Sequence, residues 1–231
     1  MQPTRTLTAH CTLSHPADGQ PLLTINNEHA KAEISLFGAH VLRYQRHSEP
    51  ASLWLSDKAV LDGSKPIRGG IPLCWPWFGP APARVGSGKP AHGFARTSLW
   101  TLDGVSDHGD GTLVHLSLRD TDASRALWPH AFELELDVLV GKELSLVLTT
   151  RNTGKTPLTY NAALHTYLQI SRPEAVSVTG LGEPYADKLT GQDGQQQGAL
   201  TLIAAIDRVY HQAGAMVMVK DGDRTTKVVS G

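Results

Sequence analysis

The length and charge of the chain limit what it can be. Its 231 residues suffice for one large all-β domain or two small ones, and 40% hydrophobic with 19% charged residues is ordinary for a globular protein. The 21 basic and 22 acidic residues leave a formal net charge of -1, so no overall basic excess attracts nucleic acid or an anionic membrane. We therefore expect neither as a partner, and an anionic ligand has to be bound by a few placed groups.

The first residues and the cysteines bear on where the protein works. The opening MQPTRTLTAHCTLS has no apolar core of signal-peptide length, and no run reaches the roughly 20 apolar residues that span a bilayer. Cys11 and Cys74 are the only cysteines. We expect a cytoplasmic protein with two free thiols.

Period-two alternation of apolar and polar residues dominates the chain. The clearest case is Phe132-Glu133-Leu134-Glu135-Leu136-Asp137-Val138, which predicts a strand with one face on a core. In chain order, the strand-like segments lie near 31–44, at 116–118, over 132–138, over 144–148, and near 157–170, 199–204, 214–220 and 225–229.

Helical periodicity is nearly absent. The best short helix is 124–127, which Trp128-Pro129 ends. Many short strands, few helices, 22 glycines and 14 prolines predict an all-β fold, a β-sandwich of antiparallel sheets. The stretch GQDGQQQG at 191–198 reads as an exposed loop rather than a linker, so we expect a single domain over 1–231.

One segment does not fit a plain sandwich strand. Residues 66–82, PIRGGIPLCWPWFGPAP, contain three glycines, five prolines and three aromatic residues. Such a loop is costly to order, and its order usually serves a rigid site. The alternative is a hydrophobic plug under a sandwich edge. Trp75, Trp77 and Phe78 could form an apolar wall for the CH face of a sugar ring, or pack in the core.

Two arginines and two histidines in short motifs could bind a ligand or react with it. Arg68 precedes a Gly-Gly pair and Arg96 ends the motif HGFAR, and both guanidiniums are forked donors suited to a phosphate or carboxylate. His92 and His165 could act as hydrogen-bonding or acid/base groups near neutral pH. The alternatives are surface ion pairs for the arginines and structural roles for the histidines.

The chain shows no metal or cofactor motif. The eleven histidines are dispersed, without a His-x-His pair or a His-Glu-x-x-His helix, and Cys11 and Cys74 are too isolated for a zinc cluster. Neither a Gly-x-Ser-x-Gly elbow nor a P-loop occurs. We expect no metal site.

Four motifs, in this order, resemble the hexose-6-phosphate mutarotases, the glucose-6-phosphate 1-epimerase-like branch of the aldose 1-epimerase family. They are IRGGIPLCWPWFG, HGFAR, HTY and GLGEPYADK, and AEISLFGAHVLRY, LWLS and IDRVY are also similar to that family. The resemblance covers about residues 30–220. It implies a twisted antiparallel β-sandwich of the galactose mutarotase-like type, with the sugar site on a concave face.

The resemblance also implies an activity, the interconversion of the α and β anomers of a hexose 6-phosphate, with glucose 6-phosphate as the leading candidate and no cofactor. His165 would be the general acid at the ring oxygen. Arg68 and Arg96 would hold the phosphate. His92 would hydrogen-bond the sugar near the reacting centre, and Asp207 would bind sugar hydroxyls. We expect the protein to act as a monomer.

Two departures from the family pattern affect the expected site. Ala91 stands where some members have a glutamine that contacts substrate. Members also continue past the region matching residue 220, through a Trp-Asn-Pro segment, to a late glutamate that acts as general base, whereas this sequence ends at Gly231. We therefore expect this chain to lack its last strands and to have at most weak activity. The nearest carboxylates, on Glu183, Asp187 and Asp207, are not obvious replacements.

Two other functions stay open beside mutarotation. The first is a non-catalytic sugar-phosphate-binding β-sandwich that kept the pocket and lost the base. The second is a structural or interaction domain in which the motifs are relics. The retained His165, Arg68 and Arg96 argue against the second.

Overall fold

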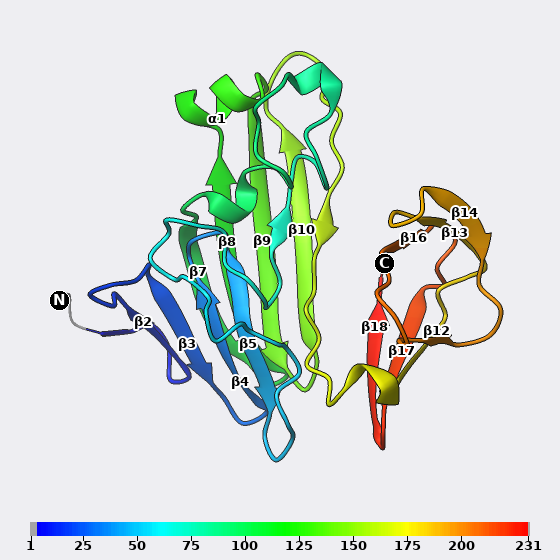
Figure 1. The fold of residues 1–231 in the computed structure, drawn as a ribbon. Coiled ribbons are helices and arrows are strands. Elements are labelled where there is room, and N and C mark those ends of the chain that lie inside the picture. Colours follow the sequence, from blue (N-terminus) through cyan, green and yellow to red (C-terminus); the bar gives the residue numbers. More distant parts are fainter. Residues whose placement is uncertain (1–3, 231) are drawn as a thin grey trace. The chain divides into compact units, whose positions relative to one another are not determined.

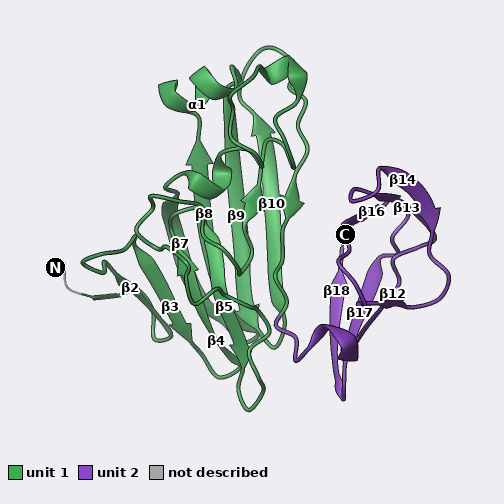
Figure 2. Ribbon diagram, in the orientation of Figure 1, with its two compact units in different colours: residues 1–168 green, residues 169–231 purple. Residues whose placement is uncertain are grey.

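Antiparallel strands make up most of the regular secondary structure, in a computed structural model that describes residues 4–230 (Figure 1). The chain divides into two units, unit 1 over Met1–Leu168 and unit 2 over Gln169–Gly231 (Figure 2). Within the described residues, no helix is both long and apolar enough to cross a membrane. The expectation of a single domain over 1–231 stays a prediction.

Unit 1 contains two sheets with the strand orders β1-β2-β3-β4-β5 and β10-β9-β8-β7. The strands of the first sheet are β1 (Arg5–Thr6), β2 (Cys11–Ser14), β3 (Leu22–Asn26), β4 (Ala30–Ser35) and β5 (His40–Arg46). Those of the second sheet are β7 (Thr101–His108), β8 (Gly111–Arg119), β9 (Phe132–Gly141) and β10 (Leu144–Asn152). One core cluster draws buried side chains from both sheets, so they form the two layers of a sandwich.

The alternation in β9 explains how this core forms. Phe132, Leu134 and Leu136 point inward with 1% exposure or less, whereas the glutamates between them lie on the outer face. The register places Leu136 opposite Leu116 of β8, and that residue is also buried. Cross-strand pairs of this kind stabilise the sheet and fix its register, since a slip of one residue would turn every apolar side chain outward.

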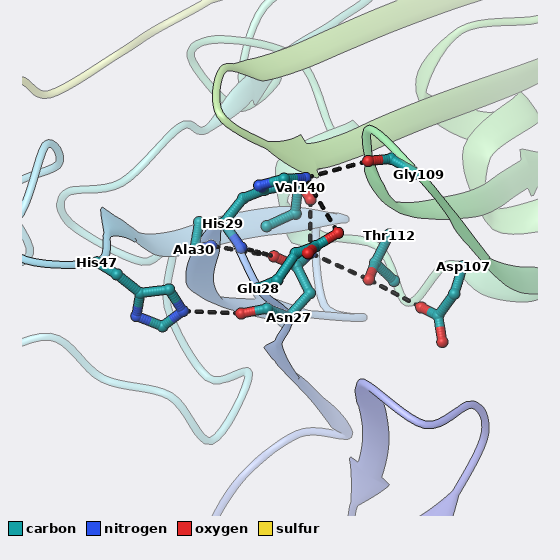
Figure 3. Close-up of polar contacts among 9 residues, drawn as sticks. All are labelled: Asn27, Glu28, His29, Ala30, His47, Asp107, Gly109, Thr112 and Val140. Carbon is teal, nitrogen blue, oxygen red and sulfur yellow. Dashed lines mark hydrogen bonds and ion pairs between the residues drawn. The ribbon is translucent and has the colours of Figure 1, made fainter.

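A polar residue joins the two sheets inside this core (Figure 3). The Asn27 side chain, between β3 and β4, donates to Thr112 Oγ1 of β8 at 3.1 Å and to the Val140 carbonyl of β9 at 2.7 Å. Its Oδ1 accepts the N–H groups of His29 and Ala30 at 2.9 and 3.0 Å. Because its amide oxygen and nitrogen both have partners, Asn27 is buried without the penalty of an unsatisfied polar group.

The segments between the sheets carry little regular structure. The two-residue strands β6 (Leu73–Cys74) and β11 (Ala163–Leu164) pair with each other, and two short 3-10 helices are η1 (Ala83–Val85) and η2 (Ala95–Thr97). The helix predicted at 124–127 is confirmed as α1 (Asp122–Leu127). It begins two residues earlier because Thr121 and Ser124 form a reciprocal capping box.

Unit 2 contains two small sheets with the orders β15-β12-β17-β18 and β14-β13-β16, and it begins with the 3-10 helix η3 (Pro173–Ala175). The strands are β12 (Val176–Thr179), β13 (Pro184–Asp187), β14 (Gln192–Gln195), β15 (Leu200–Thr201), β16 (Arg208–Tyr210), β17 (Met216–Asp221) and β18 (Arg224–Val229). Of its described hydrophobic residues, only Val176 is buried.

The structure confirms the strands predicted over 116–118, 132–138 and 144–148 and corrects two other segments. Within 157–170 only Ala163–Leu164 is a strand, because the facing loop contains prolines that cannot donate to a ladder. Within the expected loop 191–198, Gln192–Gln195 forms β14 and pairs with β13.

Candidate active site

The pairing of β6 with β11 brings the proline-rich segment 66–82 beside the HTY motif. Beyond the two strands, the His165 N–H donates to the Pro72 carbonyl at 3.0 Å and the Tyr167 N–H donates to the Gly70 carbonyl at 2.9 Å. These two hydrogen bonds fix the backbone that carries the His165 side chain. The order within 66–82 thus serves the placement of a candidate catalytic residue.

The HGFAR motif is held against the same segment by a strained turn. His92 has φ +65° and Gly93 has φ +68°, a conformation that L residues rarely adopt. Gly93 forms a parallel bridge with Trp75, and a Cβ at Gly93 would collide with the Trp75 carbonyl oxygen. The Phe94 N–H donates to that carbonyl at 3.0 Å. Residue 93 must therefore be glycine for His92 to reach this place.

The hydrogen bonds of His92 fix its tautomer. The His92 N–H donates to the Gly79 carbonyl at 2.7 Å, and the Gly79 N–H donates to His92 Nδ1 at 3.1 Å. Because Nδ1 accepts, a neutral His92 carries its proton on Nε2. That atom is a hydrogen-bond donor of the kind that suits a sugar oxygen.

His92 and His165 lie together around an exposed aromatic ring. Their ring centroids are 6.1 Å apart, and the Phe78 ring lies 5.0 Å from His92 and 5.8 Å from His165. The Tyr167 ring lies 4.9 Å from His165 on the β11 segment. Phe78 is 36% exposed, so an apolar face adjoins two groups that could exchange protons.

The other two aromatic residues of 66–82 do not form a ligand wall. Trp75 and Trp77 are at most 1% exposed and belong to the core cluster. Trp75 packs against Phe94, Trp128 and Phe132, with ring centroids 4.6 to 5.7 Å apart. The segment thus combines both expectations, a core plug and a rigid support for an exposed aromatic ring.

The two candidate phosphate ligands belong to unit 1. Arg68 is exposed on the turn before Gly69-Gly70, and its carbonyl accepts the Ser56 N–H at 3.1 Å. Arg96 lies in η2, half-buried, and its Nη2 donates to the Ala91 carbonyl at 3.0 Å. The residue at which the family pattern differs, Ala91, thus supports Arg96 through its backbone.

Asp207 belongs to unit 2, so its membership of the site stays a prediction. Its side chain is exposed and its carbonyl accepts the Lys188 N–H at 2.7 Å. The neighbouring Asp187 has a structural role, since a hydrogen bond from the Thr190 N–H lowers its pKa, and Arg208 Nε lies 3.3 Å from Asp187 Oδ2. A carboxylate with a lowered pKa is a weaker base, which argues against Asp187 as a replacement base.

Three residues near the site have no role in the sequence analysis. Tyr167 packs on His165, and Asn161 Oδ1 accepts the Phe78 N–H at 2.6 Å. The third, His40, has 0% exposure, and its Nε2 lies 2.7 Å from the Gly69 carbonyl. His40 could have been found in the sequence because it is a histidine within an otherwise apolar, strand-like segment. The other two contacts depend on loop conformation.

Both thiols are free and buried, and no described group of His, Cys, Asp and Glu residues could hold a metal ion. Burial, with a smaller effect of the Asp107 charge, raises the pKa of Cys11 to about 11. Burial also raises the pKa of Cys74, although the Arg96 charge opposes it. Neither thiol is suited to act as a nucleophile.

Comparison with known proteins gives one family. A model of the aldose 1-epimerase family matches residues 21–230. A candidate glucose-6-phosphate 1-epimerase of Escherichia coli is 36% identical over 195 residues, which are 84% of this chain and 64% of that protein. A candidate of the same name from Salmonella typhimurium is 34% identical over 216 residues, 92% of this chain and 71% of that one.

A solved structure gives the same result for the fold. The crystal structure of a candidate mutarotase (YeaD) from Salmonella typhimurium matches with a TM-score of 0.91 and 32% identity, over 98% of this chain and 76% of that chain. The all-β, mutarotase-like sandwich expected from the sequence is therefore confirmed. The chain spans about two thirds of the length of the two curated relatives described above.

Proposed function

Because the chain belongs to the aldose 1-epimerase family, we propose that the protein interconverts the α and β anomers of a hexose 6-phosphate, most simply glucose 6-phosphate. The observation that carries this proposal is the placement of the His92 and His165 rings 6.1 Å apart around the exposed Phe78. A proton-exchanging group and a hydrogen-bond donor beside an apolar face suit a sugar ring with its anomeric centre between them.

The reaction needs one proton taken and one given. A base takes the proton of the anomeric hydroxyl, the C1–O5 bond breaks as C1=O1 forms, and an acid protonates O5. Rotation about C1–C2 and reclosure by the reverse steps give the other anomer. His165 is the acid at O5 in this proposal, and His92 Nε2–H donates to a sugar oxygen at the reacting centre. The base is the role that the family resemblance gives to a late glutamate.

The phosphate is assigned to Arg68 and Arg96. A guanidinium offers two parallel donors to a phosphate and gains little from a neutral hydroxyl. This preference is the reason to propose a phosphorylated sugar rather than a free one. Asp207 is proposed to bind sugar hydroxyls, and its exposed side chain is compatible with that role.

We also propose that the protein works in the cytoplasm as a monomer, without nucleic acid, membrane or cofactor. Two free, buried cysteines suit a reducing compartment, and a net charge near zero suits a small ligand such as a sugar phosphate better than a polyanion. Light scattering after size exclusion would test the monomer directly.

Exchange NMR on the anomers of glucose 6-phosphate tests the function, with the protein expressed from its complete reading frame. We expect His165→Asn to keep binding and to slow anomer exchange by roughly 10²–10⁴-fold, the usual contribution of an acid/base group. The matched control is His108→Asn at the exposed end of β7, which should leave exchange unchanged.

Each outcome of that experiment has a distinct meaning. Equal exchange by the wild type and His165→Asn would remove His165 as the acid. Binding of glucose 6-phosphate without exchange above the buffer rate would favour a sugar-phosphate-binding protein. Absence of binding would overturn the proposed substrate.

A further inference from the structure

We propose that His40 is a positioning residue that holds the Arg68 turn and the Arg96 segment in the arrangement that binds phosphate. The imidazole does this with its two nitrogens, Nε2 toward the Gly69 carbonyl and Nδ1 as the acceptor for Arg96 Nε–H. The inference rests on the phosphate roles proposed for the two arginines. It adds a buried residue that touches neither substrate nor reacting atoms.

The first half of the argument concerns the turn that carries Arg68. His40 Nε2 lies 2.7 Å from the Gly69 carbonyl, which can only accept, so Nε2 carries a proton. A Cβ at Gly70 would come within 2.9 Å of the same nitrogen, so the turn lies directly against the ring. The Gly70 N–H donates to the Trp54 carbonyl at 2.7 Å, which completes the anchoring of the turn.

The second half concerns Arg96. Within residues 4–230, His40 Nδ1 and Arg96 Nε are both buried nitrogens without a hydrogen-bond partner. They are complementary, because the neutral Nε2–H ring has a bare acceptor at Nδ1 and a guanidinium Nε–H is a donor. Two unsatisfied buried nitrogens are costly, so in this proposal a side-chain rotation or one bridging water joins them.

Backbone contacts bring the His40 strand and the Arg96 segment together. The Gly38 N–H donates to the Ser98 carbonyl at 2.7 Å, and the Trp100 N–H donates to the Leu36 carbonyl at 2.9 Å. The positive charge of Arg96 also contributes to the low pKa of His40, after the larger effect of burial. A Cβ at Gly38, two residues before His40, would come within 2.7 Å of the Arg96 carbonyl oxygen, so the two segments are in direct contact.

The consequence is preorganisation of two donors that come from distant parts of the sequence. A phosphate gains most when both guanidiniums are already in place, because little conformational freedom is then lost on binding. His40 supplies that order from beneath and makes no contact with the ligand in this proposal. Loss of His40 should therefore weaken the binding of the phosphorylated sugar more than the binding of the free sugar.

Three variants separate the two nitrogens. His40→Gln keeps a donor near the position of Nε2 and loses Nδ1, His40→Asn keeps an acceptor near Nδ1 and loses the Gly69 bond, and His40→Leu loses both. Calorimetry with glucose 6-phosphate and with glucose gives an affinity ratio for each variant, the affinity for glucose 6-phosphate divided by the affinity for glucose. We expect the ratio to fall about fivefold in each single-bond variant and about tenfold or more in His40→Leu.

Folding is controlled by circular dichroism and thermal melts of every variant. If the ratio is unchanged in all three folded variants, His40 is only structural and the inference is wrong. The wild-type imidazole also has a direct readout that needs no variant, since its ¹⁵N chemical shifts report the tautomer. A neutral ring protonated at Nε2 at pH 7 is expected, and a ring protonated at Nδ1 would overturn the inference.

Arg68→Ala and Arg96→Ala distinguish this inference from the proposed function. If both leave the affinity ratio unchanged, the phosphate assignment itself is wrong. If they lower the ratio and the His40 variants do not, only the role of His40 is wrong. The inference stands when the arginine and His40 variants lower the same ratio.

Discussion

Arg96 joins structure and binding in a single side chain. Its Nη2 is bonded to the Ala91 carbonyl and its Nε is buried, so the guanidinium has a fixed orientation rather than the freedom of a surface arginine. Arginines that are held in this way lose less entropy when they bind an anion. The environment of Arg96 therefore suits a ligand contact better than a surface ion pair.

Arg96→Ala tests the phosphate contact. A charged hydrogen bond contributes roughly 1.5–3 kcal/mol, so glucose 6-phosphate should bind about tenfold or more weakly, whereas glucose should be affected much less. Titration calorimetry with both ligands measures the difference. The matched control is Arg119→Ala, since Arg119 is 76% exposed and pairs with Glu133 at 2.7 Å. Equal losses for the two sugars would contradict the assignment.

His40 should make stability depend on pH in a stated direction. Burial lowers its pKa from 6.5 to about 4, the Gly69 hydrogen bond opposes this effect, and the Arg96 charge adds to it. Because the unfolded chain binds the proton first, the stabilisation is present above about pH 6.5 and is lost as the pH falls toward 4. The loss is at most about 1.4 kcal/mol per pH unit.

Urea denaturation at pH 7, 6 and 5 checks this expectation. As the pH is lowered, the free energy of unfolding should fall more steeply in the wild type than in His40→Gln, which has no titrating ring at this position. Other groups titrate in both proteins and cancel in the comparison. Parallel pH profiles would show that His40 is not the group responsible.

The strands differ in how much of them could be predicted. β9 and β10 are clear in the sequence because one face of β9 is buried and apolar residues recur at every second position of both strands. β1 and β6 are two residues long, and β14 has no apolar face, so alternation gives no signal for them. Their pairing depends on backbone hydrogen bonds to a partner whose position only the fold determines.

Gly93 should be far less tolerant of substitution than Gly88. Both have positive φ, +68° and +74°, so alanine at either position carries a backbone cost of about 1–2 kcal/mol. A Cβ at Gly93 would also collide with the Trp75 carbonyl, whereas nothing lies within 4 Å of a Cβ at Gly88. We expect Gly88→Ala to lower the free energy of unfolding by this backbone cost alone, and Gly93→Ala to lower it by more.

Thermal and urea denaturation of both variants measures this difference. Because Gly93 positions His92, Gly93→Ala should also impair the binding of glucose 6-phosphate if the variant folds. Similar stability losses for the two variants would show that the close approach of residue 93 to Trp75 can relax without cost.

The candidate site combines segments that are distant in the sequence. The motifs around Arg68, His92 and His165 are predicted to be functional from their composition and the family resemblance. Their convergence at Phe78 could not be, because it depends on the pairing of β6 with β11 and on the strained turn at His92. The partner of a buried polar group such as His40 is likewise a property of the fold.

The two units should differ in local stability. Unit 1 has a continuous core, whereas Val176 is the only buried hydrophobic residue among those described in unit 2. Local opening costs least where little apolar surface is buried. Hydrogen exchange followed by mass spectrometry should show faster exchange in peptides from β17 than in those from β9. Equal protection of the two strands would contradict this expectation.

The two buried cysteines can report how often two regions of the protein open. A thiol reagent reacts only with a thiolate, and burial that raises both pKa values leaves little thiolate in the closed state. Labelling therefore reports the frequency of opening at two separate places, at β2 for Cys11 and at β6 beneath the HTY motif for Cys74. A ligand that suppresses opening around the candidate site should slow the labelling of Cys74 and leave the labelling rate of Cys11 unchanged.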